Sequence, residues 1–117
     1  MKSYTVKPKE SWEVPEGTKF SHGKIMVVEP HQSIGGPENR HEDNNQWVFV
    51  LSGHGEAIVS NKVIALKHHK LLLVEAGENH EIRNTSDETL ETLNFYAPKE
   101  YVSKNKTGQA SFRTFFL

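Results

Sequence analysis

Short apolar blocks separated by turn-forming residues dominate the chain from residue 24 onward. Each block is about four to seven residues long, and the segments between blocks are rich in Gly, Asn and Ser, which is typical of antiparallel sandwiches and barrels. No stretch before the C-terminal tail shows a sustained helical period. The sequence therefore predicts an all-β fold, a small antiparallel barrel of the double-sheet, jelly-roll kind. The expected strands are residues 24–29, 47–51, 56–59, 63–66, 71–74, 81–84 and 90–97.

The chain has 117 residues, enough for one hydrophobic core but not for two, so we expect a single domain. Its barrel should span residues 24–98. Residues 1–23 mix Pro, Gly, Ser and charged residues, which indicates an irregular arm with at most one short strand. Residues 32–37 have the composition of a loop. Residues 99–117 form a tail with an apolar end, which we expect to pack on the barrel or on a partner subunit.

Two of the expected strands are apolar on both faces. In residues 47–51 the aromatic side chains point one way and the two valines the other, and residues 71–74 are apolar throughout. A sheet with one solvated face would be polar on that face. Burial of both faces needs a second sheet inside and a further layer outside, most simply another subunit. We therefore predict a homodimer.

Composition excludes several classes of partner and site. The 14 basic and 15 acidic residues nearly balance, which gives no basic surface for nucleic acid or for a membrane, and we expect neither partner. The chain has no cysteine, which rules out disulfides and thiolate metal sites and fits the reducing cytoplasm. No segment approaches the roughly 20 apolar residues of a membrane span, and the N-terminus has no apolar signal region. We expect a cytoplasmic protein.

Polar side chains with lone pairs lie where several expected strands begin or end. On a strand–turn–strand interpretation, Asn39 and His41 share a face because they are two residues apart, and Gln46 opens the returning strand. His80 follows a glycine turn at the start of another strand. Asn39, His41, Gln46 and His80 are therefore predicted to converge inside the barrel and to bind a ligand.

The order of these residues resembles the two motifs of the cupin superfamily, G-x5-H-x-H-x3-4-E-x6-G and G-x5-P-x-G-x2-H-x3-N. The resemblance covers roughly residues 24–98. At the positions of the first motif stand Ser33, Asn39, His41, Gln46 and Gly53. In the second motif Gly77, His80 and Asn84 match, whereas His69 and Glu75 replace the first glycine and the proline.

The resemblance implies a double-stranded β-helix with a divalent metal, Fe, Mn, Ni or Zn, inside it. The usual ligands are three histidines and one glutamate, but here Asn39 and Gln46 would supply neutral amide oxygens in place of a histidine and the glutamate. A register shift would recruit Asp43 but leaves too few residues for the turn. Two outcomes stay open: a weak metal site at Asn39, His41, Gln46 and His80, or a former metal site that hydrogen-bonds an organic ligand.

The resemblance implies a small-molecule-binding protein of the cupin kind, with a metal-dependent oxygenase or an isomerase as its enzymatic form. The alternative is a non-catalytic ligand sensor or a structural dimer with a degenerate metal site. In the plainest interpretation, His41 and His80 are barrel histidines satisfied by their neighbours. Sugar-phosphate isomerisation would need basic side chains beside the histidines, but Arg40 and Arg83 are expected on the opposite face.

The other polar residues are expected in turns or at the surface. His54, His68 and His69 fall in turns, and Asn84 should cap a turn through its side chain. The interior is expected to be mostly apolar, with inward positions at Val48, Val50, Ile58 and Leu72.

Overall fold

The computed structural model describes residues 1–36 and 40–98. Within these residues the chain forms strands and no helix, and so none of its described segments is a helix long and apolar enough to cross a membrane. Asn39 and the predicted tail lie outside the described residues. The strands are β1 (Trp12–Glu13), β2 (His22–Val28), β3 (Ser33–Gly36), β4 (Asn44–Ser52), β5 (Gly55–Val59), β6 (Lys62–Leu66), β7 (Leu71–Val74), β8 (His80–Arg83) and β9 (Leu90–Pro98).

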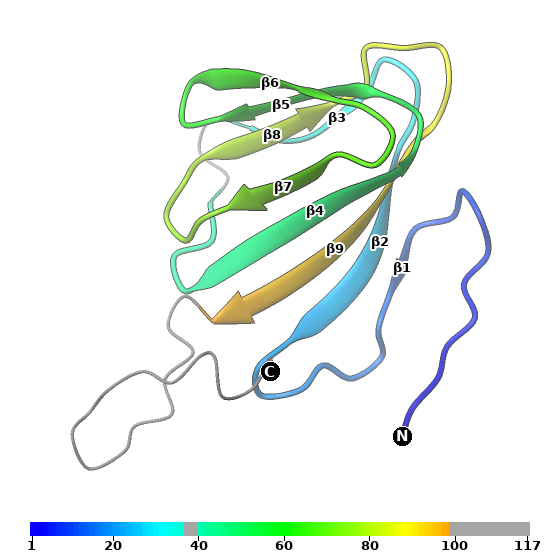
Figure 1. The fold of residues 1–117 in the computed structure, drawn as a ribbon, viewed down its shortest axis with the longest axis vertical. Coiled ribbons are helices and arrows are strands. Elements are labelled where there is room, and N and C mark those ends of the chain that lie inside the picture. Colours follow the sequence, from blue (N-terminus) through cyan, green and yellow to red (C-terminus); the bar gives the residue numbers. More distant parts are fainter. Residues whose placement is uncertain (37–39, 99–117) are drawn as a thin grey trace.

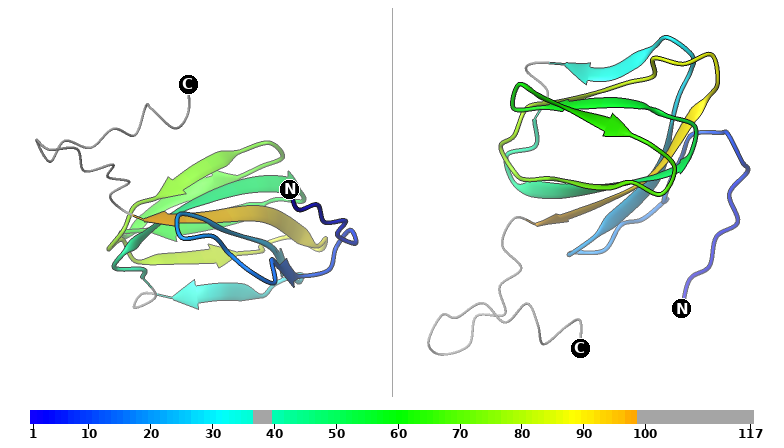
Figure 2. Two further views of the ribbon diagram at one scale, coloured as in Figure 1. Left: turned by 90° about the horizontal axis from the view of Figure 1, so that it is seen from below. Right: turned by 45° about the horizontal axis from the view of Figure 1, so that its top comes forward.

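The strands form two antiparallel sheets that face each other across a barrel (Figure 1). One sheet has the order β1-β2-β9-β4-β7 and the other the order β3-β8-β5-β6. Viewed with its top turned forward, the chain winds around a common interior, with the N-terminal arm outside (Figure 2). This architecture confirms the all-β, double-stranded β-helix prediction. The division of the chain into arm, barrel and tail stays a prediction.

The core lies between the two sheets and is built from alternate residues of the strands. In β4, Val48 and Val50 are completely buried, and Leu72 of β7 and Ile82 of β8 pack in the same cluster. Alternation places these side chains inside because successive side chains of a strand point to opposite faces. The predicted inward position of Ile58 is wrong. Its neighbours Ala57 and Val59 are the buried residues of β5, and so Ile58 faces outward.

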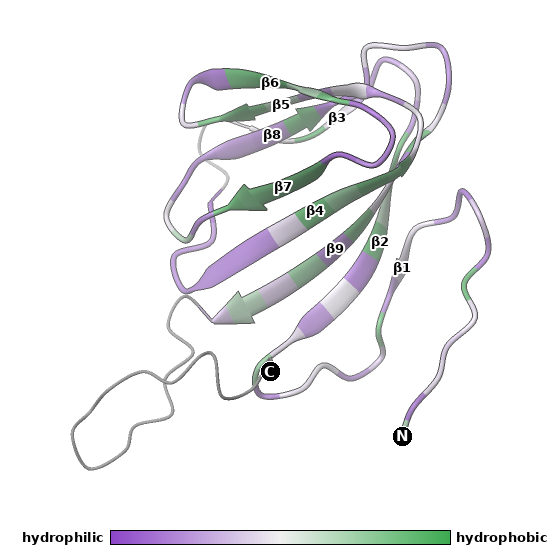
Figure 3. Cartoon of the chain, viewed as in Figure 1, coloured by the Kyte–Doolittle hydropathy of each residue, from purple (hydrophilic) through white to green (hydrophobic). Residues whose placement is uncertain are grey.

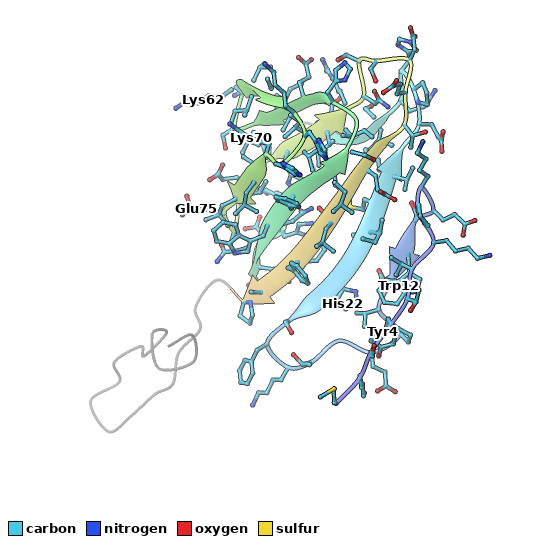
Figure 4. All side chains as sticks on the ribbon, turned by 45° about the vertical axis from the view of Figure 1, so that its right-hand side comes forward. Tyr4, Trp12, His22, Lys62, Lys70 and Glu75 are labelled. Atoms are coloured by element: carbon cyan, nitrogen blue, oxygen red, sulfur yellow. The ribbon has the colours of Figure 1, made fainter. Side chains whose placement is uncertain are left out.

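The outer face of the five-stranded sheet is also apolar. Trp47 pairs with Phe95 of β9 on one side and with Leu73 of β7 on the other, and the next outward residue of β4, Phe49, pairs with Leu71 and Leu93. β1 of the arm pairs with β2 and extends this sheet at its edge. The arm also borders the outer face, because arm residues line one space together with Leu93 and Phe95. Tyr4 and Trp12 of the arm lie together there, with ring centroids 5.2 Å apart (Figure 4).

The loop predicted over residues 32–37 is partly a strand. Ser33–Gly36 forms β3 and pairs antiparallel with β8, from Ser33 opposite Arg83 to Gly36 opposite His80. The composition gave no strand signal because β3 is an edge strand whose side chains are mostly exposed, so pairing of the backbone holds it rather than burial. This strand brings Ile34 and Gly35 to one end of the barrel.

The strand–turn–strand interpretation of the segment before Gln46 is also wrong in part. Arg40 and His41 lie in no strand, and β4 begins at Asn44, so Gln46 is its third residue. The turn expected over residues 42–45 is shorter because Asn44 and Asn45 already pair with the end of β9. His41 therefore reaches the barrel from a loop.

Candidate functional site

A cavity of about 170 Å³ opens at one end of the barrel and gathers the described residues of the predicted site. β2 and β4 both begin in polar residues and become apolar further along (Figure 3). Lys24 and Gln46, near the starts of these strands, line the cavity. A larger space, about 400 Å³, lies outside the barrel between the arm and β2, and apolar side chains dominate its lining. The smaller cavity is lined by Lys24, Met26, Ile34, Gly35, His41, Gln46, His80, Ile82 and Tyr96.

His41 and His80 lie side by side at this cavity, with ring centroids 5.2 Å apart. The turn between β7 and β8 holds them together: Gly77 adopts a positive φ of 87° there, and its amide donates to the carbonyl of His41 at 2.8 Å. His80 begins β8 and is buried, and its Nδ1 lies 3.3 Å from the carbonyl of Glu78. A carbonyl can only accept, so Nδ1 carries the proton in this hydrogen bond.

Gln46 is 1% exposed, and a chain of hydrogen bonds fixes the orientation of its amide. The hydroxyl of Thr92 donates to the carbonyl of Met26 at 3.1 Å, and the amide nitrogen of Asn94 donates to that hydroxyl at 2.9 Å. Asn94 Oδ1 must then accept, and Gln46 Nε2 donates to it at 2.9 Å. Gln46 Oε1 is left buried, without a hydrogen-bond partner among the described residues.

Lys24 and Tyr96 complete the cavity, and neither is among the residues predicted for the site. Lys24 Nζ lies 5.1 Å from the centroid of the Tyr96 ring, and this ring meets His41 edge-on with centroids 5.2 Å apart. A signal for Lys24 was present. Lys24 lies two residues before Met26 and four before Val28, and both of these point inward. Because alternate residues of a strand share a face, Lys24 points inward as well.

Burial lowers the pKa of the His41 imidazole, and the nearby His80 and Lys24 lower it further. Each of these effects disfavours a positive charge on the ring. His41 is therefore neutral at pH 7 and can accept a proton or a hydrogen bond.

Comparison with known proteins identifies the family of this domain. A family model described as a cupin domain matches residues 24–96, which is more than half of the chain. The chain belongs to the cupin family. The match includes both segments that resemble the cupin motifs, and it ends at Tyr96, the last residue of the cavity lining. No curated protein matches this cupin.

Solved structures share the cupin fold. A cupin protein from Bacteroides fragilis has a TM-score of 0.76 at 16% identity, and the alignment covers 94% of each chain. A protein from Klebsiella pneumoniae with a double-stranded β-helix domain has a TM-score of 0.67 at 22% identity, covering 92% of this chain and 85% of that one. A predicted oxalate decarboxylase from Thermotoga maritima is 26% identical with a TM-score of 0.61, and the alignment covers 66% of this cupin and 65% of that protein.

The described donors of the cavity do not suit the divalent metal that the cupin motifs imply. Among residues 1–36 and 40–98, no three His, Cys, Asp or Glu side chains gather where they could hold a metal ion. The donors near the two histidines are neutral, and Lys24 brings a positive charge into the same cavity. A divalent cation there would lack an anionic ligand and face a repelling ammonium group. The metal stays a prediction.

The remaining candidates lie away from the cavity. Arg40 and Arg83 are exposed and pair with Glu42 and Glu81 at 2.7 and 2.6 Å, so neither offers a phosphate contact inside the barrel. Asn84 caps a turn as predicted. Its amide donates to the carbonyls of Val28 and Glu88 and accepts from the backbone and hydroxyl of Ser86. The side chains of Asp43, His54, His68 and His69 are exposed.

Proposed function

We propose that this cupin binds a small organic molecule in the cavity at the end of its barrel. The observation that carries the proposal is Gln46 Oε1, a buried acceptor without a hydrogen-bond partner among the described residues, in a side chain that borders the cavity. An unsatisfied buried polar atom costs about 1–3 kcal/mol, and a ligand that donates to it would recover this energy. His41 and His80 line the same cavity and add further hydrogen-bonding groups.

The size of the cavity supports a ligand smaller than a drug-like molecule. Its 170 Å³ corresponds to about six water molecules at roughly 30 Å³ each. Met26, Ile34 and Ile82 supply an apolar wall, and the polar groups come from the other strands. Few polar anchors on an apolar lining are typical of small-molecule sites.

Ligand binding is tested by thermal denaturation of the purified protein with a library of small polar metabolites. We expect at least one compound to raise the midpoint of unfolding. His41→Ala and His80→Ala should fold but lose this response, whereas His54→Ala, at an exposed turn, should keep it. Compounds that stabilise all three variants equally would place binding elsewhere. If His41→Ala or His80→Ala unfolds instead, the two histidines serve the fold.

A second candidate function is proton transfer, the isomerase form of the same site. It is favoured by the lowered pKa of His41, because a neutral imidazole at the cavity can act as a general base. Such a base would remove a proton next to a carbonyl group of the ligand, and Tyr96 and His80 border the space in which the charge would develop.

Proton transfer is tested with hydroxypyruvate in D₂O, by following loss of the methylene proton signal. The expected result is exchange faster than in buffer alone, lost in His41→Gln and kept in His54→Gln. Exchange at the buffer rate with the unmodified protein would reject proton transfer for this substrate and leave the binding function in place.

A further inference from the structure

We propose that the ligand of this cavity is a small carboxylic acid that carries a hydroxyl or amino group next to its carboxylate, as 2-hydroxy acids do. This inference rests on the proposed binding function and specifies its ligand. Three features of the cavity carry it: its only described charge, its fixed acceptor and its apolar wall.

The charge in the cavity selects an anion. Lys24 is half-buried on the inward face of β2 and makes no ion pair with a carboxylate among the residues that the structure describes. Its ammonium group lies against the Tyr96 ring, and no Asp or Glu is among the described residues that line the cavity. A partly desolvated cation without a counter-charge favours an anionic ligand, and a hydrogen bond to a charged group is about twice as strong as a neutral one.

The acceptor in the cavity requires a donor on the same ligand. Gln46 Oε1 cannot be exchanged for the amide nitrogen by a simple flip, because Nε2 is held by Asn94 Oδ1. Asn94 is held in turn by Thr92, whose hydroxyl donates to a backbone carbonyl. A carboxylate facing Gln46 would set lone pairs against lone pairs. An acid that fits must therefore present an N–H or O–H group to Gln46 while its carboxylate faces Lys24.

The apolar side of the cavity limits the size and polarity of the rest of the ligand. Met26, Ile34 and Ile82 are apolar, and the volume corresponds to about six water molecules. A short alkyl group suits this wall, whereas a phosphate or a second carboxylate would have no further cationic side chain among the described lining residues. The chemistry therefore points to a small acid with a short alkyl group.

The inference is tested by calorimetric titration with matched compounds: lactate, propionate and lactamide. Lactate has both groups, propionate lacks the donor and lactamide lacks the charge. We expect lactate to bind about tenfold or more tightly than either, since each lost partner leaves a polar group of the cavity unpaired. Glycolate against acetate repeats the comparison with a smaller alkyl group.

Two variants separate the two contacts. Lys24→Met should remove the preference for lactate over lactamide but keep that for lactate over propionate. Gln46→Met should do the reverse, because it removes the acceptor and leaves the charge. Lys62→Met, an exposed position at the start of β6, is the matched control and should bind like the unmodified protein.

The outcomes distinguish the ligand class from binding itself. Equal affinity for lactate and propionate, or for lactate and lactamide, would overturn the ligand class. Binding of a neutral polyol that depends on His80 would also overturn the class but support the proposed function. If no acid, amide or polyol in these titrations binds, both the class and the proposed function are overturned.

Discussion

At the scale of single residues, the site depends on which way one amide points. The carbonyl of Met26 can only accept, so the hydroxyl of Thr92 donates to it and accepts from the Asn94 amide nitrogen. Asn94 Oδ1 then accepts from Gln46 Nε2, and Gln46 Oε1 is the amide atom left unpaired. The cupin motif has a glutamate at this position, which is an anion. An amide there keeps the acceptor and removes the charge, so the cavity becomes less suited to a metal and better suited to an organic donor.

The substitution Gln46→Glu should reverse this change. A carboxylate beside His41 and His80 would supply the missing anionic ligand, and we expect the variant to copurify with more divalent metal per chain than the unmodified protein. Elemental analysis of untagged protein, prepared without chelator, measures the ratio. Gln46→Met, which has no oxygen, is the control and should hold no more metal than the unmodified protein. Equal metal in Gln46→Glu and Gln46→Met would mean that the charge at this position does not govern metal binding.

The lowered pKa of His41 predicts a dependence of stability on pH. The folded protein binds fewer protons than the unfolded chain below the ordinary histidine pKa of about 6.5. The free energy of unfolding should therefore fall as the pH drops through this value toward the lowered pKa of the folded state, and level off below it. The charged and titratable groups around this ring are His80, Lys24 and Tyr96.

Urea denaturation between pH 7.5 and pH 5 checks this dependence. His41→Gln should flatten the decline, because the variant has no imidazole to protonate at this position. His54→Gln, at an exposed turn, should keep the slope of the unmodified protein. An unchanged slope in His41→Gln would show that other groups cause the decline.

At the scale of elements, the buried side chain of Asn84 ties the turn between β8 and β9 to β2. Asn84 bonds the end of β2 through the carbonyl of Val28 and closes the turn through Ser86 and Glu88. We expect Asn84→Ala to lower the free energy of unfolding by roughly 2–4 kcal/mol, because it leaves several buried groups unpaired.

Chemical denaturation measures this loss, with Thr85→Ala as the matched control. Thr85 is the exposed neighbour in the same turn, and its substitution should change the stability by less than about 0.5 kcal/mol. A loss in Asn84→Ala no larger than in Thr85→Ala would mean that the turn does not depend on these hydrogen bonds.

The sequence predicts some strands more accurately than others. β7 has the predicted bounds because its four residues are all apolar and are followed by a glycine turn. β3 was missed because backbone pairing with β8, and not burial, makes it a strand. The inward position of Lys24 follows from the alternation of side chains along a strand. The orientation of the Gln46 side-chain amide does not. It depends on hydrogen bonds to Asn94, which is distant in sequence and adjacent only in the folded sheet.

At the scale of the whole molecule, the outer face of the five-stranded sheet bears on the predicted homodimer. Trp47 is 41% exposed and Phe95 48%, and the two residues are paired across β4 and β9. Leu71, further along the same face, is also exposed. The face is therefore apolar across neighbouring strands, and Trp47, Phe95 and Leu71 stay exposed although the arm borders part of it. Exposed apolar surface of this kind is typical of protein interfaces, and a second copy of the chain stays our prediction for what covers it.

Substitution of Trp47 by lysine tests the dimer. A charge at the centre of this face would have to be desolvated without a partner when two copies meet, so Trp47→Lys should sediment as a monomer where the unmodified protein sediments as a dimer. The matched control is Val63→Lys on β6 of the other sheet, because Val63 is even more exposed, at 63%. It should leave the dimer intact. If the unmodified protein is a monomer at micromolar concentration, the homodimer prediction is wrong. If Val63→Lys alone dissociates it, the interface lies on the four-stranded sheet.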